Sequence, residues 1–152
     1  MARRKRATAM QVPQELRISA EVQQAMRNPE HRWVAVCMGT GCSSSASAEL
    51  RQALCEELKK HDLDGKVEIR RTGCFGFCAQ GPIMVVYPEE TFYTHVSPGD
   101  AKTIVEEDIL GGRRVERLLY RDAADVIIEK WHDINFYSKQ KRILLSNSGI
   151  ID

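Results

Sequence analysis

Two cysteine pairs, each in a glycine-rich run, constrain this chain more than any other feature. Cys37 and Cys42 have four residues between them, and Cys74 and Cys78 have three. A helix-length stretch of 31 residues separates the pairs. Because neither pair alone can complete a tetrahedral metal site, which needs four ligands, we expect the fold to bring the two runs together.

Four thiolates in this arrangement match the ligand set of a [2Fe-2S] cluster, in which each iron takes two cysteine sulfurs and shares two sulfides. Glycines flank the cysteines, and their missing Cβ atoms allow close approach of the backbone to the sulfurs and turns with positive φ. These glycines are Gly39, Gly41, Gly73 and Gly76. We expect backbone N–H groups to point at the sulfurs and to help set the reduction potential.

Two other functions stay open at this point. Structural zinc fits both cysteine spacings, but the long stretch between the pairs differs from a compact zinc-ribbon hairpin. A thiol redox protein would use Cys74 or Cys78, although three residues separate them and no adjacent base activates either thiol. A plant-type ferredoxin is disfavoured because it places three cysteines in one loop.

The fifth cysteine, Cys55, belongs to neither run, and we expect it to be a small packed residue on a helix. Phe75 and Phe77 flank the second pair, where they either shield the site and its docking surface or serve as ordinary core residues. Four dispersed histidines share no ligand spacing, and we expect solvated or packed roles for them. They are His31, His61, His95 and His132.

Hydrophobic patterning predicts a strand, a helix and a second strand around the first cysteine pair. Residues 33–37 are almost wholly apolar, residues 66–70 alternate, and residues 50–58 carry apolar side chains at helical spacing. A serine in the run 43–45 is the expected N-cap of the helix. Since such a unit is a right-handed crossover, its two strands run parallel and deliver both cysteine pairs to one edge of the sheet.

The next segments predict a hairpin over residues 83–87 and 91–96, followed by another helix. Ser97, Pro98 and Asp100 form a strong helix start, and Gly111-Gly112 is a stop signal. The predicted order is strand, helix, strand, strand, strand, helix. This order is an α/β fold with a thioredoxin-like mixed four-stranded sheet.

Three regions follow from these patterns. Residues 1–31 are a basic tail and a short helix, and residues 32–112 form the thioredoxin-like domain. Residues 113–152 are expected to be an extended C-terminal arm, with a short helix over 123–131 and a strand over 142–145, that leads to a partner subunit or a missing domain.

Composition excludes several classes of partner. A net charge of +1 offers no electrostatic basis for binding nucleic acid. No apolar run approaches the length of about 20 residues that spans a bilayer, so no direct membrane insertion is expected. Five cysteines, an odd number, in glycine-rich loops indicate a reducing, cytoplasmic compartment rather than a disulfide framework.

The cysteine runs resemble those of a known family. Val36–Cys42 (VCMGTGC), Thr72–Cys78 (TGCFGFC), and the later Gly81-Pro82 and Tyr87-Pro88 are similar to the thioredoxin-like [2Fe-2S] ferredoxin domain. More closely, they resemble its version at the N-terminus of the NADH-binding flavoprotein subunit of NAD-dependent or electron-bifurcating hydrogenases, formate dehydrogenases and NADH:quinone oxidoreductases. Parts of the region 115–152 resemble the connector and the first residues of the flavin domain there.

The resemblance implies that Cys37, Cys42, Cys74 and Cys78 hold a [2Fe-2S] cluster that passes single electrons, without catalysis by the chain itself. In that family the chain continues into a flavin and nicotinamide site, so FMN and NAD are expected on a missing domain or a partner. The implied partners are a flavoprotein (diaphorase) subunit and other iron-sulfur subunits. A homodimer remains open.

Overall fold

The computed structural model describes residues 32–140. The strands of its main sheet are β1 (Trp33–Cys37), β2 (Glu68–Thr72), β3 (Met84–Tyr87) and β4 (Thr91–Tyr93). Its α-helices are α2 (Thr40–Ser43), α3 (Ser47–Lys60), α4 (Ala101–Thr103) and α5 (Asn135–Ser138). The helix expected within residues 1–31 and the strand expected over 142–145 lie outside the described residues.

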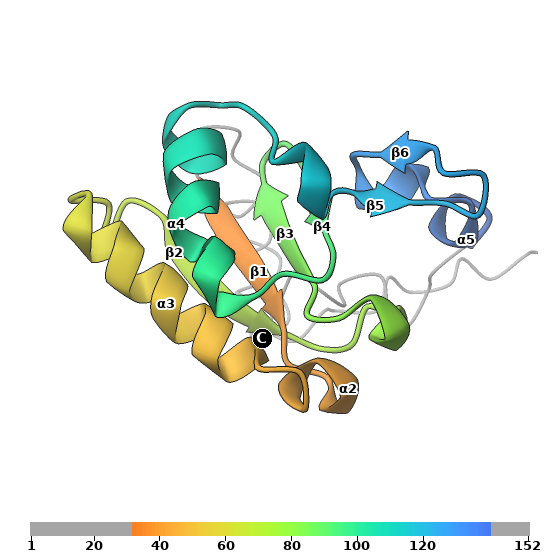
Figure 1. The fold of residues 1–152 in the computed structure, drawn as a ribbon, viewed down its shortest axis with the longest axis horizontal. Helices are drawn as coiled ribbons and strands as arrows, with labels where there is room; N and C mark the ends of the chain where they lie inside the picture. The colour runs from red at the N-terminus through yellow and green to blue at the C-terminus, as the bar shows by residue number, and fades with distance from the viewer. Residues whose placement is uncertain (1–31, 141–152) are drawn as a thin grey trace, which may run out of the picture.

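The main sheet has the order β2-β1-β3-β4 (Figure 1). β1 is parallel to β2, whereas the β1–β3 and β3–β4 pairs are antiparallel. This arrangement confirms the predicted mixed four-stranded sheet. In the parallel pair Cys37 lies opposite Thr72, the last residue of each strand. The segments that carry the cysteine pairs therefore leave the sheet at the same edge.

Each face of the sheet has its own hydrophobic core. Side chains alternate along a strand, so Val34 and Val36 of β1 pack with apolar residues of α3 and of the helix that begins at α4. Trp33, Ala35 and Cys37 pack on the opposite face. There the covering residues come from the second cysteine run and from the end of the described chain, including Phe75, Ile134 and Tyr137.

The start of α3 differs from the expectation. Its N-cap is Ala46, with a φ of 71° and no side-chain capping bond. The three preceding serines instead donate to backbone carbonyl oxygens of Met38, Thr40 and Gly41 at 3.0–3.1 Å, around the unexpected helix α2. The prediction of a serine N-cap was wrong because these hydroxyls donate to carbonyl oxygens that precede them in the chain and not to the N-terminus of α3.

The helix after β4 begins as its sequence predicts. The Ser97 amide and hydroxyl both donate to Asp100 Oδ2, at 2.8 and 2.7 Å, in a capping box. A 3-10 turn over Pro98–Asp100 precedes α4, and a π-helix over Ile104–Leu110 follows it. Gly112, with a φ of 66°, lies just beyond its end.

The C-terminal segment, as we call residues 113–140, folds back onto the domain rather than extending away from it. It contains the 3-10 turns Glu116–Leu118 and Trp131–Asp133, the two-stranded hairpin β5 (Tyr120–Arg121) and β6 (Ile127–Ile128), and then α5. Isolated bridges join Thr91 to Lys130 and Tyr93 to Leu119. The segment therefore covers the outer edge of β4.

The short helix expected over residues 123–131 does not form. Asp122 Oδ1 accepts hydrogen bonds from the amides of Ala124 (2.8 Å) and Val126 (3.0 Å), and Asp125 has a φ of 61°. Such an aspartate-anchored turn reverses the chain between β5 and β6.

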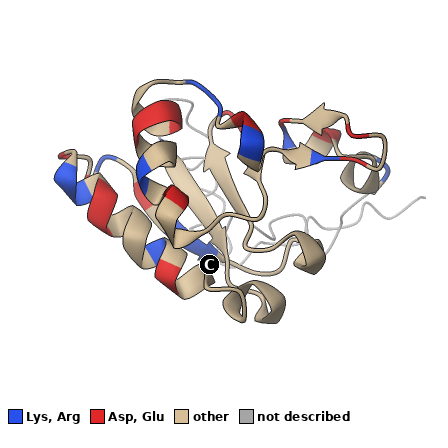
Figure 2. Ribbon diagram, in the orientation of Figure 1, with Lys and Arg blue, Asp and Glu red and all other residues tan. Residues whose placement is uncertain are grey.

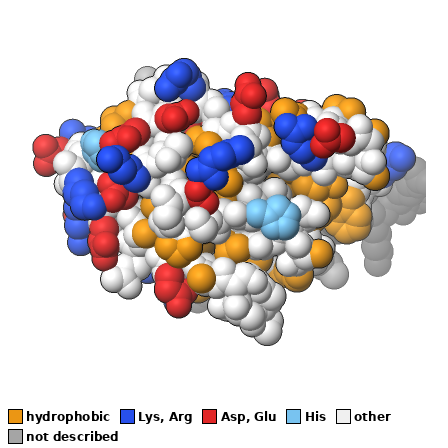
Figure 3. All heavy atoms as spheres, in the orientation of Figure 1, with side chains coloured by type: hydrophobic (Ala, Val, Ile, Leu, Met, Phe, Trp, Pro, Cys, Tyr) orange, Lys and Arg blue, Asp and Glu red, His pale blue; other side chains and the backbone are white. Residues whose placement is uncertain are grey.

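Figure 3 shows hydrophobic side chains gathered over the C-terminal segment, whereas charges of both signs are interleaved over α3 and α4. None of the helices within residues 32–140 is long and apolar enough to cross a membrane.

Candidate functional site

The four cysteines lie in two loops at one edge of the main sheet. The first cysteine loop (residues 37–42) follows β1, and the second (residues 74–78) follows β2. Backbone hydrogen bonds fix the start of the first loop, since Cys37 N–H donates to Ile83 O at 3.0 Å and Met38 N–H donates to Thr72 O at 2.9 Å. The crossover predicted from the sequence thus brings all four cysteines to one place.

Glycines of the first loop lie directly against cysteines of the second. A Cβ atom added at Gly39 would lie 2.9 Å from Cys74 Cβ, and one added at Gly41 would lie 3.0 Å from Cys78 Cβ. Real Cβ atoms essentially never approach other heavy atoms more closely than this. A side chain at Gly39 would therefore force the second loop to shift, and one at Gly41 would press on Cys78.

A third glycine, which was not among the glycines expected at the site, has the same function. A Cβ atom at Gly81 would lie 2.8 Å from Cys42 Sγ. Its position three residues after Cys78 and directly before Pro82 was the available signal. Gly76 behaves as expected, with a φ of +87° and an N–H that donates to Cys74 Sγ at 3.2 Å.

The thiols form two pairs with different exposure. Cys74 Sγ and Cys78 Sγ are 3.4 Å apart, and both residues are exposed. Cys37 and Cys42 are buried, with exposed fractions of 0% and 1%. One pair is therefore enclosed in the protein while the other faces the surroundings.

The thiols disfavour one another's ionisation. Burial, followed by the hydrogen bond and the negative charge of Cys37, raises the pKa of Cys42 to about 12, although a backbone hydrogen bond from Ile83 acts in the opposite direction. A hydrogen bond and the charge of Cys74 raise the pKa of Cys78. Because neighbouring thiolates repel one another, bound metal cations would stabilise the deprotonated form of these four cysteines.

The sulfurs are arranged as pairs rather than around one point. Within residues 32–140, no group of three or more Cys, His, Asp or Glu side chains is placed to hold a single metal ion. A tetrahedral zinc site needs four ligands about one centre. A two-iron cluster instead takes two thiolates on each iron, which is the arrangement that two cysteine pairs offer.

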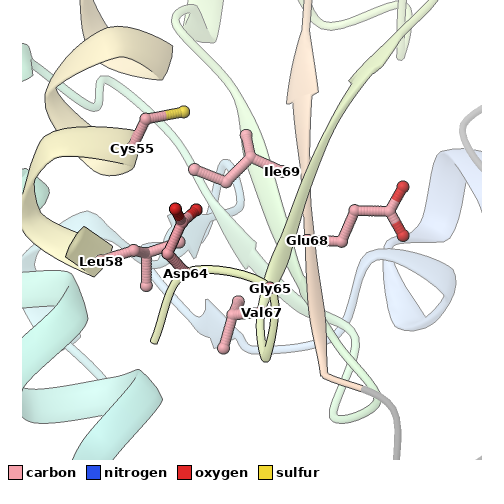
Figure 4. Close-up of a pocket in the computed structure, with 7 residues that line it drawn as sticks. All are labelled: Cys55, Leu58, Asp64, Gly65, Val67, Glu68 and Ile69. Atoms are coloured by element: carbon pink, nitrogen blue, oxygen red, sulfur yellow. The ribbon is translucent and has the colours of Figure 1, made fainter. Parts of the chain in front are cut away.

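Cys55 lies outside both cysteine loops. It is half-buried on α3 and lines a shallow pocket of about 350 Å³ between this helix and β2, with neighbours that include Leu58 and Ile69 (Figure 4). This place agrees with the expectation of a packed flanking residue.

The aromatic residues of the second loop belong to the packing of the molecule. Phe75 is 5% exposed and lies in the core on the same face as Cys37. Phe77 is partly buried, and its ring packs against those of Phe92, Tyr120, Phe136 and Tyr137. Of the two roles left open by the sequence, the structure supports the core role for Phe75.

The two chain stretches that carry the cysteines contain no charged side chain. Residues 33–48 and 72–88 contain no Lys, Arg, Asp or Glu. Figure 2 shows the consequence, since α2 and the stretch from the end of β2 into β3 are free of both charge colours. Within these two stretches, polar and apolar groups are the ones that an approaching molecule can contact.

The family model for the thioredoxin-like [2Fe-2S] ferredoxin matches residues 23–108, more than half of the chain and all four site cysteines. The chain belongs to this family. Family membership confirms the fold predicted from the sequence and implies that this thioredoxin-like ferredoxin carries a [2Fe-2S] cluster and transfers electrons.

Individual relatives agree with this assignment. A 2Fe-2S ferredoxin of Clostridium pasteurianum is 42% identical over 101 residues, which cover 61% of this chain and 98% of the relative. The NADP-reducing hydrogenase subunit HndA of Solidesulfovibrio fructosivorans is 37% identical over 78 residues, which cover 49% of this chain and 44% of that subunit. The crystal structure of the thioredoxin-like [2Fe-2S] ferredoxin of Aquifex aeolicus superposes with a TM-score of 0.56 at 34% identity, over 61% of this chain and 99% of the other.

Proposed function

We propose that this ferredoxin passes single electrons within an NAD(P)H-linked oxidoreductase complex of the hydrogenase, formate dehydrogenase or NADH:quinone oxidoreductase type. We further propose that Cys37, Cys42, Cys74 and Cys78 hold its [2Fe-2S] cluster. When bound, such a cluster accepts and releases one electron without forming or breaking a covalent bond to a substrate.

The close approach of the two cysteine loops is the main support for the ligand assignment. The backbones of Gly39 and Gly41 lie so close to Cys74 and Cys78 that an added Cβ atom would be 2.9 and 3.0 Å from the cysteine Cβ atoms, which brings the two cysteine pairs together. The donor set fits the cluster, since four thiols are grouped as two pairs. Two further structures of the Aquifex aeolicus ferredoxin carry cysteine-to-serine changes at positions four residues apart, which is also the interval from Cys74 to Cys78.

The protein groups around the cysteines have distinct functions in this proposal. Cys37 and Cys42 anchor the inner side of the site in the core, whereas Cys74 and Cys78 present its outer side to a partner. Backbone N–H donors stabilise negative charge on the sulfurs, because they place the positive end of a dipole beside it. The Gly76 N–H is such a donor to Cys74.

The proposal assigns residues 32–112 to the cluster domain and residues 113–152 to a connector toward a flavin-containing domain or subunit. FMN and NAD belong to that partner, together with further iron-sulfur subunits. Support comes from the relative HndA, which is a subunit of a hydrogenase. Because residues 33–48 and 72–88 carry no charged side chain, a partner that contacts these stretches would bind them with weak dependence on ionic strength, since screening acts on charged groups.

The test is anaerobic purification of the full chain, followed by visible spectra before and after dithionite and by analysis of iron, acid-labile sulfide and zinc. We expect about two irons and two sulfides per chain and a spectrum that bleaches on reduction. Colourless protein that holds one zinc, and takes up no cluster on reconstitution, would instead indicate the structural zinc module.

Cysteine variants test the ligand assignment separately. We expect Cys74→Ser to lower the iron content or to shift the visible and electron paramagnetic resonance (EPR) spectra, because an oxygen ligand replaces sulfur. Cys55→Ser is the matched control, since Cys55 lies on α3 outside both loops. Equal spectra for Cys74→Ser and the parent protein would remove Cys74 from the ligand set.

A further inference from the structure

The second cysteine loop is held by a part of the chain that lies beyond the family match. That match ends at residue 108, whereas the rings around Phe77 come largely from the C-terminal segment. The centroid of Phe77 lies 5.5 Å from that of Tyr120, 5.3 Å from that of Phe136 and 5.2 Å from that of Tyr137. The C-terminal segment therefore packs against one side of the second cysteine loop.

One polar contact reaches from the segment into the loop backbone. The Tyr137 hydroxyl, at the end of a side chain in α5 that is 5% exposed, donates a hydrogen bond to the carbonyl oxygen of Phe75. Phe75 is itself buried. The two residues are 62 positions apart in the chain, so this bond depends on the docked position of the segment.

The carbonyl of Phe75 and the N–H of Gly76 belong to the same peptide group. This N–H donates to Cys74 Sγ at 3.2 Å. A planar peptide turns as one unit, so a bond that fixes the carbonyl also fixes the direction of the N–H. A peptide carbonyl that accepts a hydrogen bond is also polarised, which strengthens the bond donated by its N–H by about 10–30%.

We propose that Tyr137 is a positioning residue for the [2Fe-2S] cluster and acts through the Phe75–Gly76 peptide on the sulfur of Cys74. This inference rests on the proposed function, because it requires Cys74 to be a cluster ligand. An N–H donor withdraws electron density from the sulfur and favours the more negative, reduced state. The hydroxyl of Tyr137 therefore raises the reduction potential of the cluster.

The test compares Tyr137→Phe with Tyr120→Phe in the cluster-loaded full chain. Both changes remove one hydroxyl from the same group of rings. Tyr120 is the matched control because no hydrogen bond of its hydroxyl is present within residues 32–140, whereas the Tyr137 hydroxyl binds Phe75. The measurements are a redox titration followed by EPR and the iron–cysteine stretching bands in resonance Raman spectra.

We expect Tyr137→Phe to lower the midpoint potential. At the potential where the parent protein is half reduced, the ratio of reduced to oxidised cluster in Tyr137→Phe should be about twofold lower than in the parent. For a one-electron couple this corresponds to a midpoint potential lower by about 18 mV. The iron–cysteine bands should shift as the N–H bond to sulfur weakens, and Tyr120→Phe should match the parent in both measurements. A Tyr137→Phe protein with the parent's potential and bands would overturn the inference while leaving the proposed function intact.

A second replacement provides a test if the Tyr137→Phe protein does not take up a cluster. A fluorinated tyrosine at position 137 keeps the ring and donates more strongly, so the potential should rise. A fall or no change would contradict the inference. A parent chain that binds no cluster would instead contradict the proposed function, which distinguishes the two failures.

Discussion

At the scale of single residues, the site depends as much on missing side chains as on sulfurs. Cys37 and Cys42 on one loop would not meet Cys74 and Cys78 on the other if side chains stood between them. A Cβ atom added at Gly39, Gly41 or Gly81 would lie 3.0 Å or less from an atom of Cys74, Cys78 or Cys42, respectively. Substitution of a glycine therefore tests the geometry without removing a thiol.

We predict that Gly39→Ala lowers cluster retention. The new Cβ would lie 2.9 Å from Cys74 Cβ and 3.2 Å from Cys74 Cα, so the second loop must shift. Overpacking of this kind costs about 1–3 kcal/mol. Iron per chain after anaerobic purification and desalting is the measurement, and we expect less than about half of the parent's content.

Gly99→Ala is the control for this prediction. A Cβ atom there would lie 3.7 Å from Ser97 Oγ, which is an ordinary van der Waals contact. Its iron content should equal that of the parent. If Gly39→Ala also retained the full iron content, the close approach of the two loops could not be a requirement of the site.

At the scale of secondary-structure elements, a buried polar network joins the π-helix to the C-terminal segment. The Tyr93 hydroxyl donates to Asp108 Oδ2 at 2.7 Å and accepts from the Val115 N–H at 3.1 Å. Arg114 donates to Asp108 Oδ1 at 2.9 Å. Burial raises the pKa of Asp108, although Tyr93 and Arg114 act against it. The hydroxyl of Tyr93 thus provides a hydrogen-bond partner to a carboxylate of the π-helix and to a backbone N–H of the C-terminal segment.

We predict that Tyr93→Phe destabilises the protein by about 1–3 kcal/mol, because it leaves a buried N–H and a carboxylate oxygen without this partner. Urea unfolding of the full chain, followed by far-ultraviolet circular dichroism, measures the effect as a lower midpoint at unchanged slope. Tyr120→Phe should stay within about 0.5 kcal/mol of the parent. Equal midpoints for the two variants would show that this network contributes little to stability.

Elements with strong local signals were predictable from the sequence. Residues 33–37 form β1 because five consecutive, mostly apolar residues suit a strand buried on both faces. The start of the helix at Ser97 was predictable because its capping groups lie within four residues of one another. The crossover rule then placed the two cysteine loops at one edge.

Elements held by distant contacts were not predictable. The C-terminal segment contains strands of two residues, too short for any hydrophobic period, and it is positioned by contacts such as that of Tyr137 with Phe75. The role of Gly81 was missed because its proximity to Cys42 arises only from tertiary packing. Local patterns carry no record of such contacts, since tertiary packing overrides propensity in short elements.

At the scale of the whole molecule, the C-terminal segment completes the fold. β4 is one of the two outer strands of the main sheet, and an exposed edge strand would leave backbone groups unpaired. Here the Phe92 N–H donates to Glu129 O at 2.7 Å, and the Thr94 N–H donates to Leu118 O at 2.8 Å. The segment thus covers this edge, and its next turns cover the face that holds the buried cysteines.

We predict that the C-terminal segment and the main sheet open together. Hydrogen exchange of the full, cluster-loaded chain should then give the amides of Phe92 and Thr94 the same protection as those of the central strand β1, because all would exchange only through global unfolding. If the segment detached by itself, these two amides would exchange faster, with each tenfold difference equal to about 1.4 kcal/mol. Tyr137 can hold the Phe75 carbonyl only while the segment is docked, so such detachment would also weaken the hold of this hydroxyl on the second cysteine loop.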